Sequence, residues 1–523
     1  MGELTLDPIR WLLALAPIGV ILFLMVGLRW GGAKAGPVGW LVALGVGVLF
    51  FGAGPRLLAY SQLRALLLTL FVLYIIWMAL VLFNVVNEAG AIEVISQGLT
   101  FLTGDKNLQL LIMGWVFSAF LQGVAGFGVP IAVVAPLLMG LGFSPVMAVV
   151  VPAIGHSWSV TFGDIASSFN ALIASTDLPG LALAPWSAFF LGLACLACGV
   201  ACLHYYQGFR ALRRSWLALL IMGGVMALVQ YFLAVSGLWN LAGFVAGMAG
   251  LAAALLVARL PSYRGSHSGS SPPPIKGGKQ GLLLATSAYL LLILIVTAAE
   301  LWPPLHRLLN GVVITASFPQ VKSSLGWVTE AGMGKGISLF GHAGALLAYT
   351  SFLAYLIYGR NGCYQPGALS RIFHQTLRSA IPSSIGIASM VGMAMIMDHC
   401  GMTMILAQGL SQTVGGAFPL VSPFIGLLGA FMTGSNTNSN VVFAPLQKNT
   451  AQLIGISVLP ILGAQTTGGS LGSMLAPAKI IVGCTTAGLA GQEGRVLRIT
   501  VVYGVAITAL IALFTLLAVY VLR

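Results

Sequence analysis

Charged residues are scarce in this chain. Only 7% of its 523 residues are Asp, Glu, Lys or Arg, and just 11 are acidic. A soluble globular domain needs about 25% charged residues, so this composition excludes an ordinary aqueous surface. Hydrophobic residues make up 58% of the chain instead, and apolar runs of about 20 residues, long enough to cross a membrane as helices, recur along it. The sequence therefore predicts an all-α, polytopic membrane protein.

Cysteine is also sparse, and none of the six cysteines has the paired spacing of a zinc site. Cys195, Cys198 and Cys202 fall in one apolar run at roughly helical intervals, where we expect them to pack as small side chains. The HExxH metal motif is absent from the sequence. We therefore expect neither a metal nor a cofactor.

Basic residues exceed acidic residues and give a net charge of +13. Most of them lie in short connections between apolar runs, as the positive-inside rule of membrane proteins predicts. The lipid bilayer accounts for this charge, so we expect no nucleic-acid partner.

A segment rich in Ser, Gly and Pro divides the chain. Residues 259–280 contain the run SHSGSSPPP, whose composition cannot bury a core, and basic residues favour a cytoplasmic location for the segment. We interpret it as a flexible linker between an N-terminal half, residues 1–258, and a C-terminal half, residues 281–523.

Glycine and proline interrupt the hydrophobic sequence of the first half. LQGVAGFGVP, Leu121–Pro130, contains three glycines and a proline and predicts the tip of a helical hairpin near residues 115–143. A broken helix is expected over residues 145–165, interrupted at Gly155–Ser159. Unpaired backbone groups cost several kcal/mol in hydrocarbon, so such interruptions favour a segment that lines a polar cavity.

The second half repeats this order. A hairpin near residues 424–448 has the polar tip TGSNTNSN, and a broken helix over residues 452–490 is expected to be interrupted at Gln465–Ser470. FLQG at Phe120–Gly123 matches FMTG 311 residues later, and PAIG at Pro152–Gly155 matches PILG 308 residues later. Inverted repeats with broken helices are typical of secondary transporters. We predict two such repeats, with roughly 12 spans plus two re-entrant hairpins.

The interrupted segments supply the candidate substrate-binding residues. Free amides at helix N-termini and the helix dipole favour anions, and hydroxyl and amide side chains add further hydrogen bonds. The candidates are Gly126, Phe127, Gly128, Ser435, Asn436, Thr437, Asn438, Thr466, Thr467, Gly468 and Lys479. The alternative is that the small residues only allow close helix packing and that the lysine extends to the membrane interface.

Two titratable residues lie in the first broken helix, Asp164 and His156. An ionisable residue inside a membrane segment is a functional hypothesis by default, so both are candidates for carrying a proton. The alternatives are a helix-end carboxylate facing water for Asp164 and a hydrogen-bonded structural imidazole for His156.

The interrupted blocks resemble the L-lactate permease family. The motifs that carry the resemblance are LQGVAGFGVPIAVVAPLLMGLGF at Leu121–Phe143, TGSNTNSN with its continuation through FAPLQ at Phe443–Gln447, TAQLIGIS at Thr450–Ser457 and TTGG at Thr466–Gly469. This family carries L-lactate and related 2-hydroxymonocarboxylates, such as glycolate, by proton symport. The resemblance implies a secondary transporter of a small organic anion in the plasma membrane, of the bacterial inner-membrane type.

The chain is also similar to a wider ion-transporter grouping, in which Ser-Asn-Thr tips bind a coupling ion and the substrate carboxylate. Ser435, Asn436 and Thr437 match that tripeptide. The resemblance implies a homodimer of elevator type, with a fixed scaffold and a moving transport domain. An acidic residue commonly stands in the family where this chain has Gln122, and often an Asp where it has Asn436. Asp164 is therefore the leading candidate for coupling.

Other functions remain open from sequence. The chain could instead be a sodium-coupled transporter or a carrier of di- or tricarboxylates. A channel would need a continuous polar pathway, whereas paired interrupted helices suggest an occluded site. An intramembrane protease could use Phe162-Gly163-Asp164 with Asp398, but the first glycine of Gly-x-Gly-Asp is absent, so an enzyme is not expected.

Overall fold

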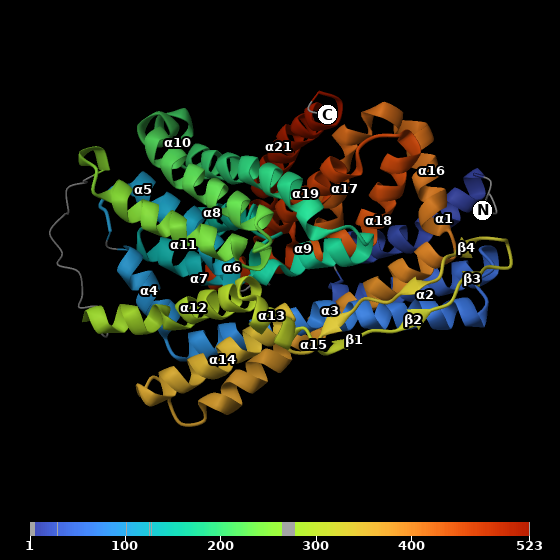
Figure 1. The fold of residues 1–523 in the computed structure, drawn as a ribbon. Coiled ribbons are helices and arrows are strands. Elements are labelled where there is room, and N and C mark those ends of the chain that lie inside the picture. The colour runs from blue at the N-terminus through green and yellow to red at the C-terminus, as the bar shows by residue number, and fades with distance from the viewer. Residues whose placement is uncertain are drawn as a thin grey trace.

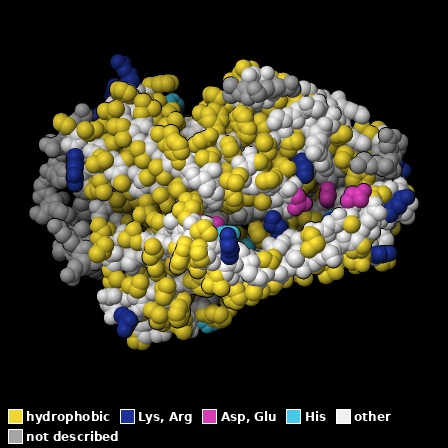
Figure 2. Space-filling view, viewed as in Figure 1, with side chains coloured by type: hydrophobic (Ala, Val, Ile, Leu, Met, Phe, Trp, Pro, Cys, Tyr) yellow, Lys and Arg dark blue, Asp and Glu magenta, His cyan; other side chains and the backbone are white. Residues whose placement is uncertain are grey.

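The computed structural model describes residues 6–28, 30–100, 102–124, 126, 128–263 and 278–521. Within these residues, ten helices are long and apolar enough to cross a membrane by length and composition, fewer than the roughly 12 spans predicted. The chain is an all-α, polytopic membrane protein. One of them, α10 (Gly180–Val235), bends at Gln207 and Gly208 and joins two long apolar segments. Hydrophobic side chains cover most of the face in Figure 2, and charged ones are few.

Helices α2 (Gly32–Phe50), α3 (Pro55–Glu88), α14 (Ala343–Arg360) and α15 (Ala368–His399) form the lower layer in Figure 1. The blue α3 and the orange α15 are far apart in sequence and lie side by side. The indole nitrogen of Trp77 donates to Ser384 Oγ at 2.9 Å, and the buried Asn84 Nδ2 donates to Thr376 Oγ1 at 2.9 Å, so polar bonds as well as apolar packing join these two helices.

The described β structure consists of three short antiparallel pairs between residues 313 and 338. The pairs are β1 (Val313–Ile314) with β6 (Ile337–Ser338), β2 (Ser317–Phe318) with β5 (Gly332–Met333), and β3 (Val321–Lys322) with β4 (Val328–Thr329). The helices outside the lower layer and outside the hairpins and interrupted helices described below are α1 (Pro8–Leu22), α4 (Ala91–Thr100), α11 (Trp239–Ala258), α12 (Gly278–Leu301), α13 (Pro303–Leu309), α16 (Met402–Val414) and α21 (Glu493–Tyr520). Most of the predicted 259–280 linker, residues 264–277, lies outside the described residues.

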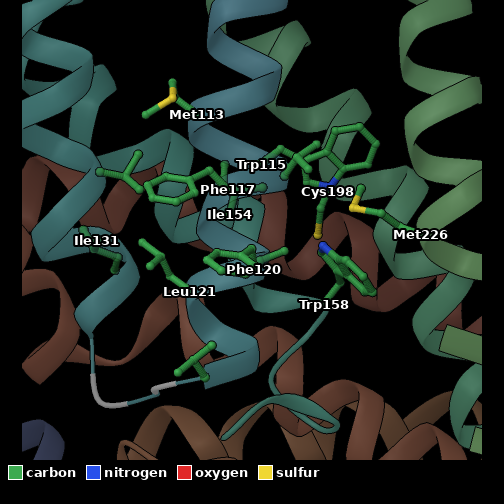
Figure 3. Close-up of a cluster of buried hydrophobic side chains, with 14 of the residues drawn as sticks. Met113, Trp115, Phe117, Phe120, Leu121, Ile131, Ile154, Trp158, Cys198 and Met226 are labelled. Carbon is green, nitrogen blue, oxygen red and sulfur yellow. The ribbon is translucent and has the colours of Figure 1, made fainter. Parts of the chain in front are cut away.

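The first hairpin region runs through α5 (Lys106–Leu111), a π-helical turn (Ile112–Phe117), α6 (Ser118–Val124) and α7 (Val129–Gly140). A large apolar cluster fixes these helices, and Figure 3 shows Trp115, Phe120 and Ile131 within it together with side chains from α8 and α10. Trp115 is fully buried. The π-helical turn and α6 are buried throughout, whereas α7 is buried on one side and exposes Pro136. The buried part has the protein surroundings that a helix with a broken backbone requires in a membrane.

The first interrupted helix consists of α8 (Pro145–Ser157) and α9 (Gly163–Thr176). The predicted break at Gly155–Ser159 starts too early, because α8 continues through Ser157. A Cβ on Gly155 would overlap the carbonyl oxygen of Gly114, so this glycine allows close helix packing and does not end the helix. The break itself begins at Trp158.

The second hairpin is formed by α17 (Phe418–Thr433) and α18 (Asn436–Ile454). Gly434 has φ +70° and turns the chain between them, a conformation that a residue with a Cβ rarely adopts. Ser435 caps α18, accepting a hydrogen bond from the Asn438 amide at 3.5 Å. The start of α18 therefore carries the Asn-Thr-Asn-Ser-Asn run on its first turns.

The second interrupted helix consists of α19 (Val458–Gly472), a 3₁₀ turn (Ser473–Leu475) and α20 (Pro477–Thr486). The predicted interruption at Gln465–Ser470 is wrong, since those residues are helical. Gly468 lets α19 approach α17 so closely that a Cβ would overlap the Pro423 carbonyl oxygen, and neighbouring helices satisfy the polar side chains of the run. The break falls just before Pro477, which has no amide hydrogen to continue the helix.

Candidate functional site

Three interrupted elements meet at a buried polar junction. Asn436 Nδ2, at the start of α18, donates to Thr161 Oγ1 at 3.0 Å and to the Thr466 carbonyl at 3.2 Å. Thr161 Oγ1, in the break after α8, donates to the same Thr466 carbonyl at 3.0 Å. At most 2% of each residue is exposed, so water contributes little to these contacts. The junction ties the second hairpin tip to both interrupted helices.

A second set of contacts continues the junction along α9. Asn440 Nδ2 donates to the Ser168 carbonyl and to Thr466 Oγ1, each at 2.9 Å. The hydroxyls of Ser168 and Thr437 share a hydrogen bond at 3.1 Å. Asn436 and Asn440 lie one turn apart and therefore face the same direction, which places both amides against Thr466.

Ser470 satisfies the backbone that the break in α8 leaves open. Its Oγ donates to the Ser157 carbonyl at 2.6 Å and accepts from the Thr161 amide at 3.3 Å. A helix end buried without such partners is destabilising, so α19 supports the interrupted helix of the other half of the chain.

Several buried polar atoms have no hydrogen-bond partner among the described residues. They include the side-chain oxygens of Gln122, Asn436, Asn438 and Asn440 and the Nε2 atom of His156. Unpaired buried polar atoms are rare and costly. A cluster of them beside a broken helix is typical of a site that a ligand completes.

Asp164 is the acid of this site and stands on a strained turn. Asp164, Ile165 and Ala166 have φ of +50°, +51° and +56°, values that cost a residue with a Cβ about 1 to 2 kcal/mol each. Ser167 Oγ donates to Asp164 Oδ2 at 3.3 Å, and the Gly126 amide donates to the same carboxylate. Strain of this kind collects at functional positions.

Lys479 is the buried cation of this site. Its Nζ donates to Ser473 Oγ in the break before α20, and only 7% of the residue is exposed. Lys479 and Asp164 act on each other electrostatically, although the ion pairs within 4.0 Å among the described residues do not include them. Gly128 at the first hairpin tip, with φ +90°, lies against the Lys479 side chain.

His156 lies near the same cation, in the last turn of α8. Its Nδ1 lies 2.6 Å from the Pro152 carbonyl oxygen. Because a carbonyl can only accept a hydrogen bond, Nδ1 is the donor. Its Nε2 is left without a partner among the described residues. The imidazole is thus oriented by the backbone and presents one free nitrogen to the interior.

The predicted site residues fall into two groups. Asn436, Thr437 and Thr466 meet at the junction with Ser435 and Asn438 beside them, while Gly126, Gly128, Gln122, Asp164, His156 and Lys479 gather around the first tip. Thr467 and Gly468 lie apart from these groups: the Thr467 hydroxyl bonds the Gly463 carbonyl at 2.8 Å, and Gly468 packs on α17. Phe127 lies outside the described residues.

Sequence reasoning missed Thr161, Ser168 and Ser470, which bond directly to the predicted residues. Thr161 lies three residues before Asp164, inside the interruption itself, so its position offered a signal. Ser168 and Ser470 lie within regular helices, and only their partners across helices distinguish them from ordinary small packing residues.

A chain of buried amides supports the junction from behind. Gln447 Nε2 donates to Gln465 Oε1 and to the Ser422 carbonyl, and Gln465 Nε2 donates to Ser439 Oγ at 3.1 Å. All four side chains are fully buried. They hold α17, α18 and α19 in one register, which fixes the second hairpin tip.

Lys448, a basic residue further along α18, is not part of the site. Its Nζ donates to the Thr176 carbonyl at 2.7 Å. A cation at a helix C-terminus is stabilised by the helix dipole, so Lys448 serves to cap α9.

A polytopic helical protein with a buried polar site between interrupted helices belongs to the membrane transporters. Within that class, the chain belongs to the L-lactate permease family, whose pattern matches residues 10–522. The predicted family is therefore confirmed, and the protein is a permease, not an enzyme.

Individual relatives match along nearly the whole chain. The L-lactate permease of Salmonella typhi is 29% identical over 98% of this chain and 96% of its own length. The glycolate permease GlcA of Escherichia coli (strain K12) is 27% identical over 100% and 97%. Among solved structures, the YdaH transporter of Alcanivorax borkumensis aligns with a TM-score of 0.44 and 16% identity over 85% of this chain and 84% of that chain.

Proposed function

We propose that this protein is a secondary active transporter that carries L-lactate, or a related 2-hydroxymonocarboxylate such as glycolate, across the bacterial plasma membrane together with a proton. Family membership and the names of the relatives support this substrate class. The buried junction of Asn436, Thr161 and Thr466 is the observation that carries the proposal, since it joins the polar breaks of both halves.

The substrate carboxylate binds between the two hairpin tips. The free amides and dipole at the start of α18 favour an anion, and Lys479 supplies a full positive charge. The hydroxyl of Thr161 and the amide of Asn436 lie 3.0 Å apart, and Thr437 is the next residue along α18, so all three are candidates to contact a molecule of lactate size. Such a set of donors also suits a 2-hydroxyl group, which can both donate and accept.

Asp164 takes up the coupling proton, with His156 and Gln122 beside it. Asp164 is the titratable acid that touches the first tip through the Gly126 amide, whereas the amide of Gln122 cannot take up a proton in this pH range. Sodium is the alternative coupling ion. The unpaired amide oxygens of Asn436 and Asn440 favour it, because amide oxygens are ligands for hard cations.

The two halves form inverted repeats, with re-entrant hairpins and interrupted helices that meet near the midplane. In an elevator mechanism these elements move as one body, because the junction and the amide chain tie them together. The layer of α2, α3, α14 and α15 is the scaffold, and two copies of the chain form a homodimer through their scaffolds.

Uptake into proteoliposomes tests the proposal. With an inward proton gradient, purified protein should accumulate labelled L-lactate above the external concentration, and excess glycolate should compete while succinate and citrate should not. Accumulation of L-lactate above its external concentration, driven by protons, also excludes a channel, because a channel cannot couple the two fluxes. Accumulation that ignores protons and follows a sodium gradient would overturn proton coupling, and competition by citrate but not glycolate would overturn the substrate class.

A further inference from the structure

Lys479 and Asp164 both lie beside the first hairpin tip. A Cβ on Gly126 would lie 3.6 Å from Asp164 Oδ2, and a Cβ on Gly128 would lie 3.6 Å from the Cα and Cγ atoms of Lys479. The two glycines that contact this acid and this base are therefore only two positions apart in sequence, and the acid and the base are each at most 7% exposed.

The ammonium of Lys479 is only partly satisfied. It has three donors, and Ser473 is its hydrogen-bond partner among the described residues. A buried ammonium is stable only when an anion or several hydrogen bonds compensate it. Asp164 is the anion that acts on it electrostatically in this structure, without direct contact.

We infer, building on the proposed function, that Lys479 pairs with one carboxylate at a time. In the empty site it is balanced by ionised Asp164. In the loaded site Asp164 is protonated, and Lys479 binds the carboxylate of the substrate instead. The substrate anion and Asp164 thus compete for one cation, and the proton decides which of them holds it.

Charge balance makes this exchange a coupling device. The empty site, with ionised Asp164 and charged Lys479, has no net charge, and neither has the loaded site, with protonated Asp164, charged Lys479 and one anion. A site with only the proton carries +1, and a site with only the anion carries −1. Moving a net charge through the membrane interior is costly, so only the empty and fully loaded sites cross.

The groups around Asp164 and Lys479 add no charge to the net charge of the site. His156 is the titratable neighbour of Lys479 besides Asp164. Its Nδ1 donates to the Pro152 carbonyl, its Nε2 has no acceptor among the described residues to stabilise a second proton, and full burial disfavours a charge, so we count it as neutral. Gln122, Ser167 and Ser473 are uncharged. Asp164 and Lys479 form no ion pair within 4.0 Å among the described residues, so the substrate carboxylate does not have to break a direct contact between them.

Binding measurements test the exchange. L-lactate is titrated into purified protein by calorimetry from about pH 5.5 to about pH 8.5, where proton linkage predicts that the wild-type Kd rises by up to about tenfold per pH unit at the alkaline end. Asp164→Asn should give a Kd independent of pH, with lactate exchange intact and proton-driven accumulation lost. Lys479→Gln should raise the Kd by at least about 30-fold at every pH, while Lys479→Arg should retain binding.

A thermal-stability cycle of Asp164→Asn, Lys479→Gln and the double variant tests the pairing without any substrate. The double variant should melt above Lys479→Gln, because that single variant leaves Asp164 without its cation. Additive effects in the cycle, or wild-type binding by Lys479→Gln, would overturn the exchange. If the wild type binds no L-lactate or glycolate but binds another carboxylate, the proposed substrate fails and the same titration with that anion tests the exchange.

Discussion

Replacing Thr161 by valine tests the junction with little change of shape. The substitution removes the hydroxyl that accepts from Asn436 Nδ2 and donates to the Thr466 carbonyl, both at 3.0 Å. Asn436 also donates to that carbonyl at 3.2 Å, so the carbonyl stays satisfied and Asn436 loses one acceptor. Two lost buried hydrogen bonds are worth about 2 to 3 kcal/mol, which corresponds to about 30- to 150-fold in substrate affinity if binding depends on the junction.

The assay for Thr161→Val is L-lactate binding and uptake, with thermal unfolding measured on the same preparation. Thr161→Ser, which keeps the hydroxyl, should transport normally. Thr515→Val is a matched control, since Thr515 is fully buried and, within the described part of the chain, its hydroxyl bonds only the Ile511 carbonyl at 2.7 Å. This variant should lose no transport. Wild-type affinity in Thr161→Val, or an equal loss in Thr515→Val, would refute a binding role for the junction.

Two further substitutions test the close contact and the strained turn. Gly469→Ala should abolish most uptake, because its Cβ would overlap Asn436 Oδ1. Gly224→Ala is the control, since its Cβ has open space around it, and it should transport normally. Equal uptake by both variants would contradict the importance of the close contact at Gly469. Ala166→Gly should destabilise the protein less than Ala171→Gly in the regular part of α9, by about 1 to 2 kcal/mol, because glycine relieves the positive φ of residue 166. Thermal unfolding that ranks the two variants in the opposite order would show that the turn is not strained.

The sequence was sufficient to predict the second hairpin tip. TGSNTNSN is a polar run inside an apolar chain, and polar residues in hydrocarbon need partners, so local composition was enough to predict a buried polar tip, while its role in binding stays a prediction. Asn436 bonds the Thr466 carbonyl in the structure, and Thr437 bonds Ser168 on α9.

Other features could not be predicted because they depend on contacts between distant segments. The helix through Gln465–Ser470 persists because the hydroxyls of Thr161 and Ser439 bond the side chains of Thr466 and Gln465, and neither partner is near the helix in sequence. Gly155 was interpreted as a helix break, but it permits contact with Gly114. In the sequence, a glycine that ends a helix cannot be told from a glycine that allows two helices to pack closely.

The location of bound substrate tests the central claim most directly. Diffraction from crystals soaked with a bromine-labelled lactate should show anomalous signal between the two hairpin tips, within contact of Thr161, Asn436 and Lys479, and no signal there in Thr161→Val. Signal that lies elsewhere in wild-type protein, with the junction empty, would contradict the account.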